Sequence, residues 1–188
     1  MSFSAVILAG GKSSRMGRDK AWLEVGGQTL LARQIGIVRE AGALEIFISG
    51  RADVDYSSFG CRVLKDKFQN AGPLAGIVRA LDASTSQLLL VLAVDMPNMS
   101  VSFLQSLATK CAHGSGAIPR VEGRIEPLAV FYPKAAHTLA VMLLDRGCYA
   151  VTNFAECCVK NNLASFVDVP ESDVGYFANW NAESELFR

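Results

Sequence analysis

Short apolar segments alternate with segments of helical periodicity over the first 110 residues of the chain. Residues 3–9 and 87–94 contain one polar side chain each, which is typical of strands that are buried on both faces of a parallel sheet. Between them, residues 29–41 place Leu31, Ile35 and Val38 on one helical face. We therefore expect an α/β fold in which a mostly parallel sheet lies between two layers of helices.

The same patterns predict the other elements. Pro73 is expected to begin a helix as its first residue, and Ser100 or Ser102 is expected to cap the next helix. The pattern becomes less regular from Gly114 onward. Further strands are expected at 44–49, 61–65, 117–119, 128–132 and 165–169, and further helices at 133–144, 149–160 and 181–187.

Composition excludes several classes of protein. With 51% hydrophobic and 19% charged residues, the chain is not intrinsically disordered. Its 18 basic and 18 acidic side chains balance, whereas a duplex-binding protein carries a basic surplus. No apolar run is long enough to span a membrane and no secretory signal is visible, so a cytoplasmic location is expected. The five cysteines lack a C-x-x-C spacing, which argues against a zinc ribbon.

The segment after the first predicted strand combines glycines with cations. It runs LAGGKSSRMGRDK from Leu8 to Lys20. Successive backbone N–H groups at glycines can form an anion nest, and lysine and arginine side chains neutralise phosphate oxygens. The spacing matches neither a P-loop nor the dinucleotide-binding fingerprint. We predict a polyphosphate-binding loop here, and the alternative is a solvated basic loop.

Asp95 closes the most apolar predicted strand. A carboxylate in that position is costly unless a group binds it. Mg²⁺ takes one or two carboxylates together with substrate phosphates and water. Asp95 is therefore predicted to hold Mg²⁺ against a triphosphate, and the alternative is an aspartate that caps the turn before Pro97.

The glycine-rich segment resembles the signature L-A-G-G-x-S-x-R-M-G-x-x-K of the nucleotidyltransferase family that includes molybdenum cofactor guanylyltransferase. Three further motifs match that family in order and spacing: Gly72-Pro73-Leu74-Ala75-Gly76, Val94-Asp95-Met96-Pro97 and Asn179-Trp180-Asn181. The resemblance covers essentially the whole chain. It implies one domain over residues 1–188, of the Rossmann-like, nucleotide-diphospho-sugar transferase-like fold. Residues 1–110 would bind the nucleotide and residues 111–188 the acceptor.

The resemblance also implies roles for individual residues. Gly10 stands where the cytosine-selecting branch of the family carries alanine, and the missing Cβ leaves room for guanine. Gly76 lowers helix propensity in a first turn, which a closely approaching ligand would explain. The amides of Asn179 and Asn181 suit the polar edges of a pterin, and Glu126 is placed near the same acceptor. The implied nucleotide contacts are Leu8, Ala9, Gly10, Gly11, Lys20, Asp66, Gly72, Pro73, Leu74, Ala75, Gly76 and Asp95.

The implied reaction transfers GMP from GTP to the terminal phosphate of molybdopterin and releases pyrophosphate. Mg²⁺ is the expected cofactor, and Lys20 and Arg15 would neutralise the triphosphate. Proteins that deliver the pterin or receive the product are further expected partners, whereas nucleic acid and membranes are not. The alternatives are a cytidylyltransferase of the same cofactor, another nucleotidyltransferase, and a non-catalytic GTP-binding protein.

Overall fold

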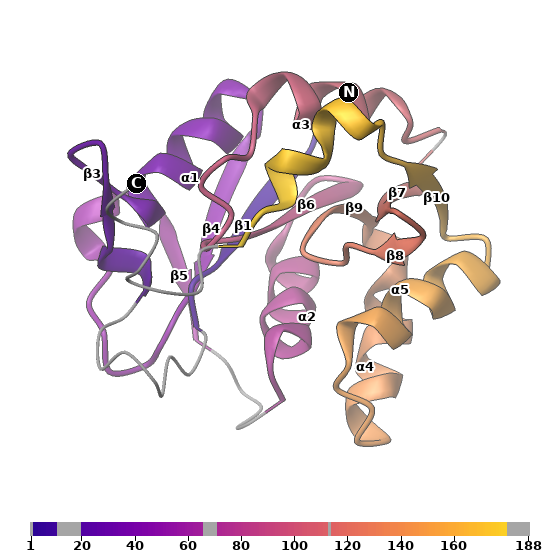
Figure 1. Cartoon of the computed structure of the whole chain (residues 1–188). Coiled ribbons are helices and arrows are strands. Elements are labelled where there is room, and N and C mark those ends of the chain that lie inside the picture. The colour runs from indigo at the N-terminus through magenta and orange to yellow at the C-terminus, as the bar shows by residue number, and fades with distance from the viewer. Residues whose placement is uncertain (1, 11–19, 66–70, 113, 180–188) are drawn as a thin grey trace.

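A computed structural model describes residues 2–10, 20–65, 71–112 and 114–179 (Figure 1). Eight strands form one sheet in the order β10-β7-β9-β6-β1-β4-β5, with β8 paired to β7. The strands of this sheet are β1 (Ser4–Leu8), β4 (Glu45–Ser49), β5 (Arg62–Leu64), β6 (Leu88–Ala93), β7 (Gly116–Val121), β8 (Arg124–Ile125), β9 (Ala129–Pro133) and β10 (Ala164–Asp168). The α-helices are α1 (Leu30–Glu40), α2 (Pro73–Ala83), α3 (Val101–Thr109), α4 (His137–Asp145) and α5 (Val151–Lys160).

Strand direction brings several chain segments to one edge of the sheet. Strands β5, β4, β1 and β6 are parallel neighbours, and β7 is parallel to β10. Strand β9 runs antiparallel between β6 and β7. The carboxyl ends of the parallel strands therefore meet the amino end of β9 at the same edge, which is where ligands bind in sheets of this kind.

The sheet is covered on both faces, which confirms the predicted three-layer α/β architecture. The side chains of β6, the central strand, alternate between the two faces. Leu88, Leu90 and Leu92 pack on the side of α1 and α3, whereas Leu89 and Val91 pack on the side of α2, α4 and α5. Burial of each such side chain contributes about 1.5–3 kcal/mol.

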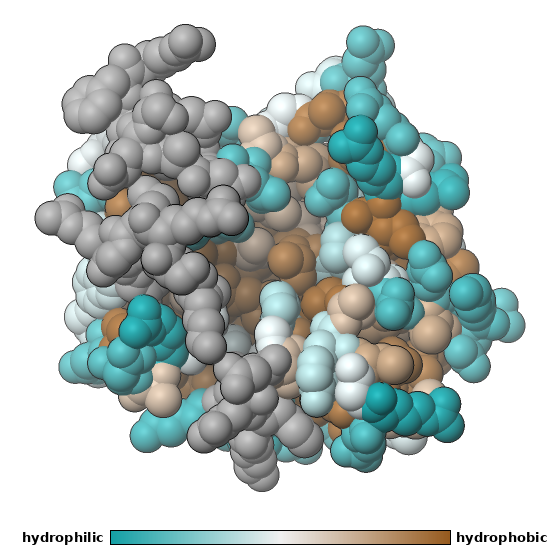
Figure 2. All heavy atoms as spheres, turned by 60° about the horizontal axis from the view of Figure 1, so that its bottom comes forward, coloured by the Kyte–Doolittle hydropathy of each residue, from teal (hydrophilic) through white to brown (hydrophobic). Residues whose placement is uncertain are grey.

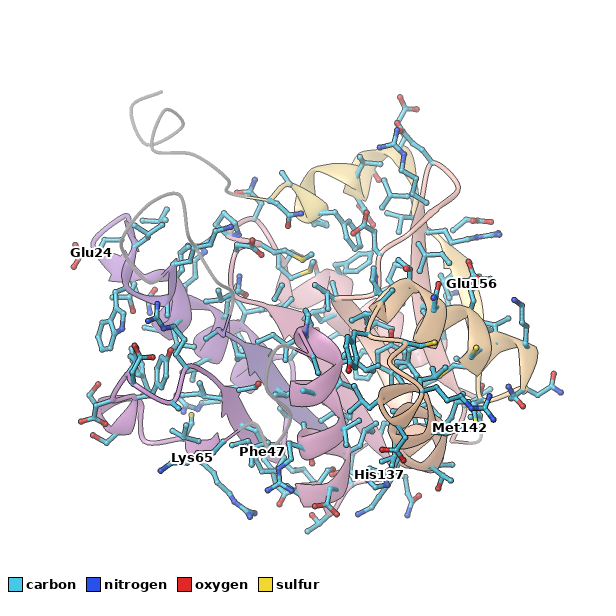
Figure 3. The ribbon with its side chains drawn as sticks, turned by 90° about the horizontal axis from the view of Figure 1, so that it is seen from below. Glu24, Phe47, Lys65, His137, Met142 and Glu156 are labelled. Atoms are coloured by element: carbon cyan, nitrogen blue, oxygen red, sulfur yellow. The ribbon has the colours of Figure 1, made fainter. Side chains whose placement is uncertain are left out.

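Helix α2 occupies the middle of its layer. Viewed from below (Figure 3), it lies between the β4–β5 region, marked by Phe47 and Lys65, and α4, marked by His137 and Met142. Among the described residues, no helix is both long and apolar enough to cross a membrane.

The expected helix at 133–144 is wrong at its start. Pro133 ends strand β9 and pairs with Leu88 of β6. A proline can end a strand in this way because the neighbouring amide, that of Lys134, makes the hydrogen bond to Gln87 O (2.8 Å). A 3₁₀ turn, η3 (Lys134–Ala136), then leads into α4.

Several short elements have no counterpart in the predictions. They are the hairpin β2 (Glu24–Val25) and β3 (Gln28–Thr29), and the 3₁₀ turns η1 (Lys20–Trp22), η2 (Ser57–Phe59) and η4 (Glu171–Phe177). The expected helix at 149–160 begins two residues later, at Val151, and Ser100 rather than Ser102 caps α3. The expected helix at 181–187 lies outside the described residues.

A polar network joins the amino ends of β1 and β4 to the loop after α2. Ser4 Oγ donates to Glu45 Oε2 (2.7 Å) and accepts from Ser84 Oγ (2.9 Å). The backbone N–H and the hydroxyl of Thr85 also donate to Glu45 Oε2, at 2.9 and 2.8 Å. The Ser4 hydrogen bond, followed by the Thr85 amide, lowers the pKa of the Glu45 carboxyl. The network therefore favours the ionised form of Glu45.

This lowered pKa predicts a pH dependence of stability. Because the pKa is lower in the folded chain than in the unfolded chain, Glu45 stabilises the fold above the ordinary glutamate pKa of about 4.3. That contribution is lost as the pH falls through the folded-state pKa. Glu45→Gln should therefore show a shallower fall in the free energy of unfolding than wild type over this acidic range. Urea unfolding measured pH by pH tests this, with Glu40→Gln, at an exposed position of α1, as the control. Parallel curves for Glu45→Gln and wild type would contradict it.

Candidate active site

Asp95 and Lys20 meet at the carboxyl edge of the sheet. Val94 N–H donates to Leu8 O (3.2 Å), so Asp95 follows the last backbone bond that ties this segment to β1. Lys20 Nζ lies 2.8 Å from Asp95 Oδ2, and each side chain is 23% exposed. The two residues are 75 positions apart in the chain. The structure thus brings together two of the residues predicted to handle the triphosphate, and their roles stay predictions.

The position of Lys20 depends on the loop that follows β4. Lys20 begins η1, and the ring of Trp22 in the same turn contacts the ring of Phe59 in η2, with centroids 5.2 Å apart. Tyr56 of this loop is buried, and a Cβ at Gly50 would come within 2.3 Å of the Tyr56 ring. The glycine at position 50 therefore leaves the space that the Tyr56 ring occupies. No pattern in the sequence indicates any of these contacts.

Helix α2 begins at the same edge, next to β4 and β5. Its N-cap, Gly72, has φ 62° and ψ −157°, a backbone conformation that is essentially restricted to glycine. Gly72 has no side chain to bond the first turn of the helix. Pro73 has no N–H and the Ala75 N–H donates to Gly72 O (3.2 Å), so the Leu74 N–H is the first-turn donor left to bind an anion or a polar base edge. The predicted segment Gly72–Gly76 is therefore arranged as a helix start that offers this donor.

The structure gives another reason for Gly76 than the ligand suggested by the sequence. A Cβ at Gly76 would lie 2.2 Å from Ser49 Oγ and 3.0 Å from Leu8 Cδ2. Glycine is required here because α2 packs directly against the ends of β4 and β1. A nucleotide contact at Gly76 stays a prediction.

Gly10 has different surroundings. A Cβ there would be 3.6 Å from the carbonyl carbon of Gly50, which is an ordinary van der Waals distance. Gly10 is exposed, whereas Ala9 is buried and donates its N–H to Ser49 O (2.8 Å). The described residues therefore leave room for an alanine at position 10.

Glu126, one of the residues predicted to contact the acceptor, also lies at this edge of the sheet. Ala93 N–H donates to Leu128 O (2.8 Å), which holds the segment containing Glu126 beside the end of β6. Glu126 is half-buried, and desolvation raises the pKa of its carboxyl, opposed by the charge of Arg124. Asn179 is exposed two residues after Phe177. That segment is anchored because the Phe177 ring packs edge-on against Phe103 of α3, with centroids 5.2 Å apart.

Four predicted site residues lie outside the described part of the chain, namely Gly11, Arg15, Asp66 and Asn181. Figure 2 brings the lower side of Figure 1 forward and shows a hollow near the centre of the described surface, with apolar side chains on its visible floor and hydrophilic side chains around it.

The donor set suits a metal ion that is shared with a substrate. In the ranges that the structure describes, no group of three or more His, Cys, Asp or Glu side chains could form a protein-only metal site. Asp95 offers one partly exposed carboxylate. One carboxylate fits Mg²⁺, which commonly takes its remaining ligands from substrate phosphates and water.

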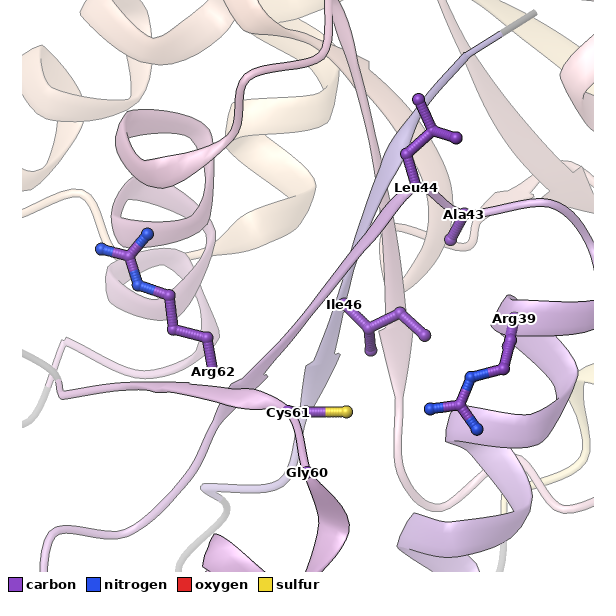
Figure 4. Close-up of a pocket in the computed structure, with 7 residues that line it drawn as sticks. All are labelled: Arg39, Ala43, Leu44, Ile46, Gly60, Cys61 and Arg62. Atoms are coloured by element: carbon purple, nitrogen blue, oxygen red, sulfur yellow. The ribbon is translucent and has the colours of Figure 1, made fainter.

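A second hollow, of about 240 Å³, lies at the opposite edge of the sheet (Figure 4). Its lining residues come from the end of α1, the start of β4 and the residues around the start of β5, and the Cys61 thiol points toward Arg39. Burial raises the pKa of this thiol. Because this hollow is remote from the carboxyl ends of the strands, it is separate from the site around Asp95.

Comparison with known proteins decides the family. The family model described as the MobA-like NTP transferase domain matches residues 5–158. The chain belongs to this family. The predicted resemblance to this family is thereby confirmed. The motifs around Lys20, Gly72 and Asp95 lie within the matched range, and their roles stay predictions.

Family members from several organisms align with most of the chain. A "probable molybdenum cofactor guanylyltransferase" from Opitutus terrae is 39% identical over 190 residues, which covers 100% of this chain and 94% of that relative. A protein of the same description from Pelotomaculum thermopropionicum is 32% identical, covering 98% and 90%. The structure of molybdopterin-guanine dinucleotide biosynthesis protein A from Archaeoglobus fulgidus superposes with a TM-score of 0.75 at 19% identity, covering 99% and 95%. This last likeness shows the fold.

Proposed function

We propose that the chain is a guanylyltransferase that moves GMP from GTP to the phosphate of molybdopterin, forming the guanine dinucleotide cofactor and pyrophosphate. The observation that carries the proposal is the Lys20–Asp95 pair (2.8 Å) at the carboxyl edge of the sheet, the edge at which α2 also begins. The full-length relatives described as guanylyltransferases support the choice of reaction.

In the proposed reaction, an oxygen of the acceptor phosphate forms a bond to the α-phosphorus of GTP. The bond from that phosphorus to the β-phosphate oxygen breaks, and the electron pair leaves with pyrophosphate. The acceptor phosphate is already ionised near pH 7, so no side chain has to remove a proton. Positioning and charge stabilisation supply most of the rate in such reactions.

Each described residue has a defined task in this scheme. Asp95 would hold Mg²⁺, which neutralises phosphate charge and orients the leaving group when bound. Lys20 Nζ, held at Asp95 (2.8 Å), would contact the triphosphate and the charge that develops on pyrophosphate. The Leu74 N–H in the first turn of α2 would face the guanine base or a phosphate. Glu126 and Asn179 would contact the pterin.

The test is to incubate the purified chain with Mg²⁺, molybdopterin and each of the four nucleoside triphosphates in turn, and to identify the product by mass. A guanine dinucleotide with stoichiometric pyrophosphate is the expected result. A cytosine dinucleotide would identify a cytidylyltransferase. Binding of GTP without pyrophosphate release would indicate a non-catalytic GTP-binding protein.

Gly10→Ala tests base selection. Because the protein leaves ordinary contact distance for the added Cβ (3.6 Å), the fold should persist while space on the ligand side is lost. We expect the ratio of kcat/KM for GTP to that for CTP to fall about 10-fold or more, since one methyl group in a binding site is worth about 10- to 200-fold. Gly36→Ala, where a Cβ would meet nothing within 4 Å, is the matched control. An unchanged ratio in Gly10→Ala would remove position 10 from base selection.

A further inference from the structure

Two neighbouring side chains of α1 hold the turn that follows Asp95. Arg33 Nε donates to Pro97 O (2.7 Å), and Gln34 Nε2 donates to Met96 O (2.6 Å). These contacts join residues that are more than 60 positions apart in the chain. Neither residue belongs to the motifs from which the site was predicted.

Asp95 therefore lies between two anchors. On its amino side, Val94 N–H donates to Leu8 O (3.2 Å). On its carboxyl side, the carbonyl of Met96 is bonded to Gln34. Because peptide units are planar, these bonds fix the 93–94 unit and the 96–97 unit. The backbone of the three residues between the two units, with Asp95 in the middle, is thereby restricted. That backbone determines where the Asp95 carboxylate is presented to Lys20.

The stability of the fold does not explain why a glutamine occupies position 34. Its side chain is fully buried. Within the described part of the chain, its buried Oε1 atom has no hydrogen-bond partner, which is an unfavourable arrangement. The Met96 carbonyl already accepts a second hydrogen bond, from Met99 N–H (3.1 Å). Removing Gln34 would therefore leave Met96 O bonded and would also remove an unpaired buried oxygen.

We propose that Gln34, assisted by Arg33, is a positioning residue for the reaction. It orients the turn at Met96 so that the carboxylate of Asp95 stands where the triphosphate and its metal ion bind. The inference rests on the proposed function for its effect on rate, whereas the anchoring of the turn can be measured without any substrate.

Gln34→Met is the decisive variant, because methionine has a similar length and no amide. We expect a melting temperature equal to or slightly above that of wild type. We expect kcat for guanylyl transfer to fall about 10- to 100-fold, as displacements of about 1 Å at a reacting centre do, with the KM for GTP changed less than about 3-fold. Hydrogen exchange of the amides at 95–99, which are those of residues 95, 96, 98 and 99 because Pro97 has no N–H, should be faster than in wild type.

Gln105→Met on α3 is the matched control, since that glutamine is exposed and its side chain reaches Glu40 O at 3.5 Å rather than the turn. It should leave kcat and the exchange at 95–99 unchanged. Arg33→Met, at a half-buried position, is the second variant. If Gln34→Met fails to fold, the same measurements of kcat, KM and hydrogen exchange on Arg33→Met test the proposal.

The outcomes separate the two proposals. Unchanged exchange at 95–99 in a folded Gln34→Met overturns the anchoring, whatever the activity. A change confined to the KM for GTP, or full kcat despite faster exchange, overturns the positioning role. Absence of guanylyl transfer by the wild-type chain overturns the proposed function, and the exchange measurement still decides whether Gln34 anchors the turn.

Discussion

Asp95→Asn should lower kcat for guanylyl transfer about 10³-fold while the chain stays folded. The amide keeps the size of the side chain but removes the negative charge that would bind Mg²⁺, and removal of a group that stabilises transition-state charge costs about 10²–10³-fold or more. The fold should tolerate the change because the ion pair with Lys20 is partly exposed, and such pairs contribute about 0–1 kcal/mol.

Steady-state kinetics at several Mg²⁺ concentrations measure this effect, and thermal unfolding checks the fold. Asp82→Asn is the matched control, because Asp82 pairs with Arg79 at 3.2 Å on the exposed side of α2. It should retain wild-type kinetics. Turnover within a few-fold of wild type in Asp95→Asn would mean that Asp95 does not hold the metal ion.

Lys20→Met should reduce kcat/KM for GTP about 10²-fold. The methionine keeps an apolar stem but lacks the ammonium group, which would otherwise make charge-assisted hydrogen bonds to the triphosphate and to the departing pyrophosphate. Part of the loss should be seen as weaker GTP binding by calorimetry. The rest should be seen in kcat, because charge on pyrophosphate develops only as the bond breaks.

Two comparisons make the Lys20 result specific. Lys160→Met removes an exposed lysine that pairs with Glu156 at 3.5 Å and should leave the kinetics unchanged. The double exchange Lys20→Asp with Asp95→Lys keeps an ion pair of opposite polarity and should not recover transfer. Recovery of activity in the double exchange would mean that the pair serves only to join η1 to the end of β6.

Much of the fold was predictable because burial constrains residue type at every position of a central strand. Strand β6 is apolar from Leu88 to Ala93 because it is covered on both faces, and such a run is typical of a strand inside a parallel sheet. Pro133 was misassigned because proline is compatible both with a first helical turn and with the end of a strand. Pairing with Leu88 decides between them.

The parts of the candidate site that lie in short sequence motifs were predictable, because residue type alone identifies the chemical groups they supply. The motifs around Lys20, Gly72 and Asp95 name the donors for phosphate and metal, and the structure brings Lys20 and Asp95 together. The packing reason for Gly76 could not be predicted, because it depends on Ser49 of a separate strand. Gln34 and Arg33 were missed because a polar side chain on an amphipathic helix ordinarily faces solvent.

The sequence by itself determined the alternation of elements, the family motifs and the chemical groups available at the ends of the strands, because these depend on local periodicity and residue type. Only the tertiary structure decided that Lys20 meets Asp95, that Ser49 requires a glycine in α2, and that α1 holds the turn after Asp95. These contacts join segments far apart in the chain, and their geometry exists only once the helices have packed against the sheet.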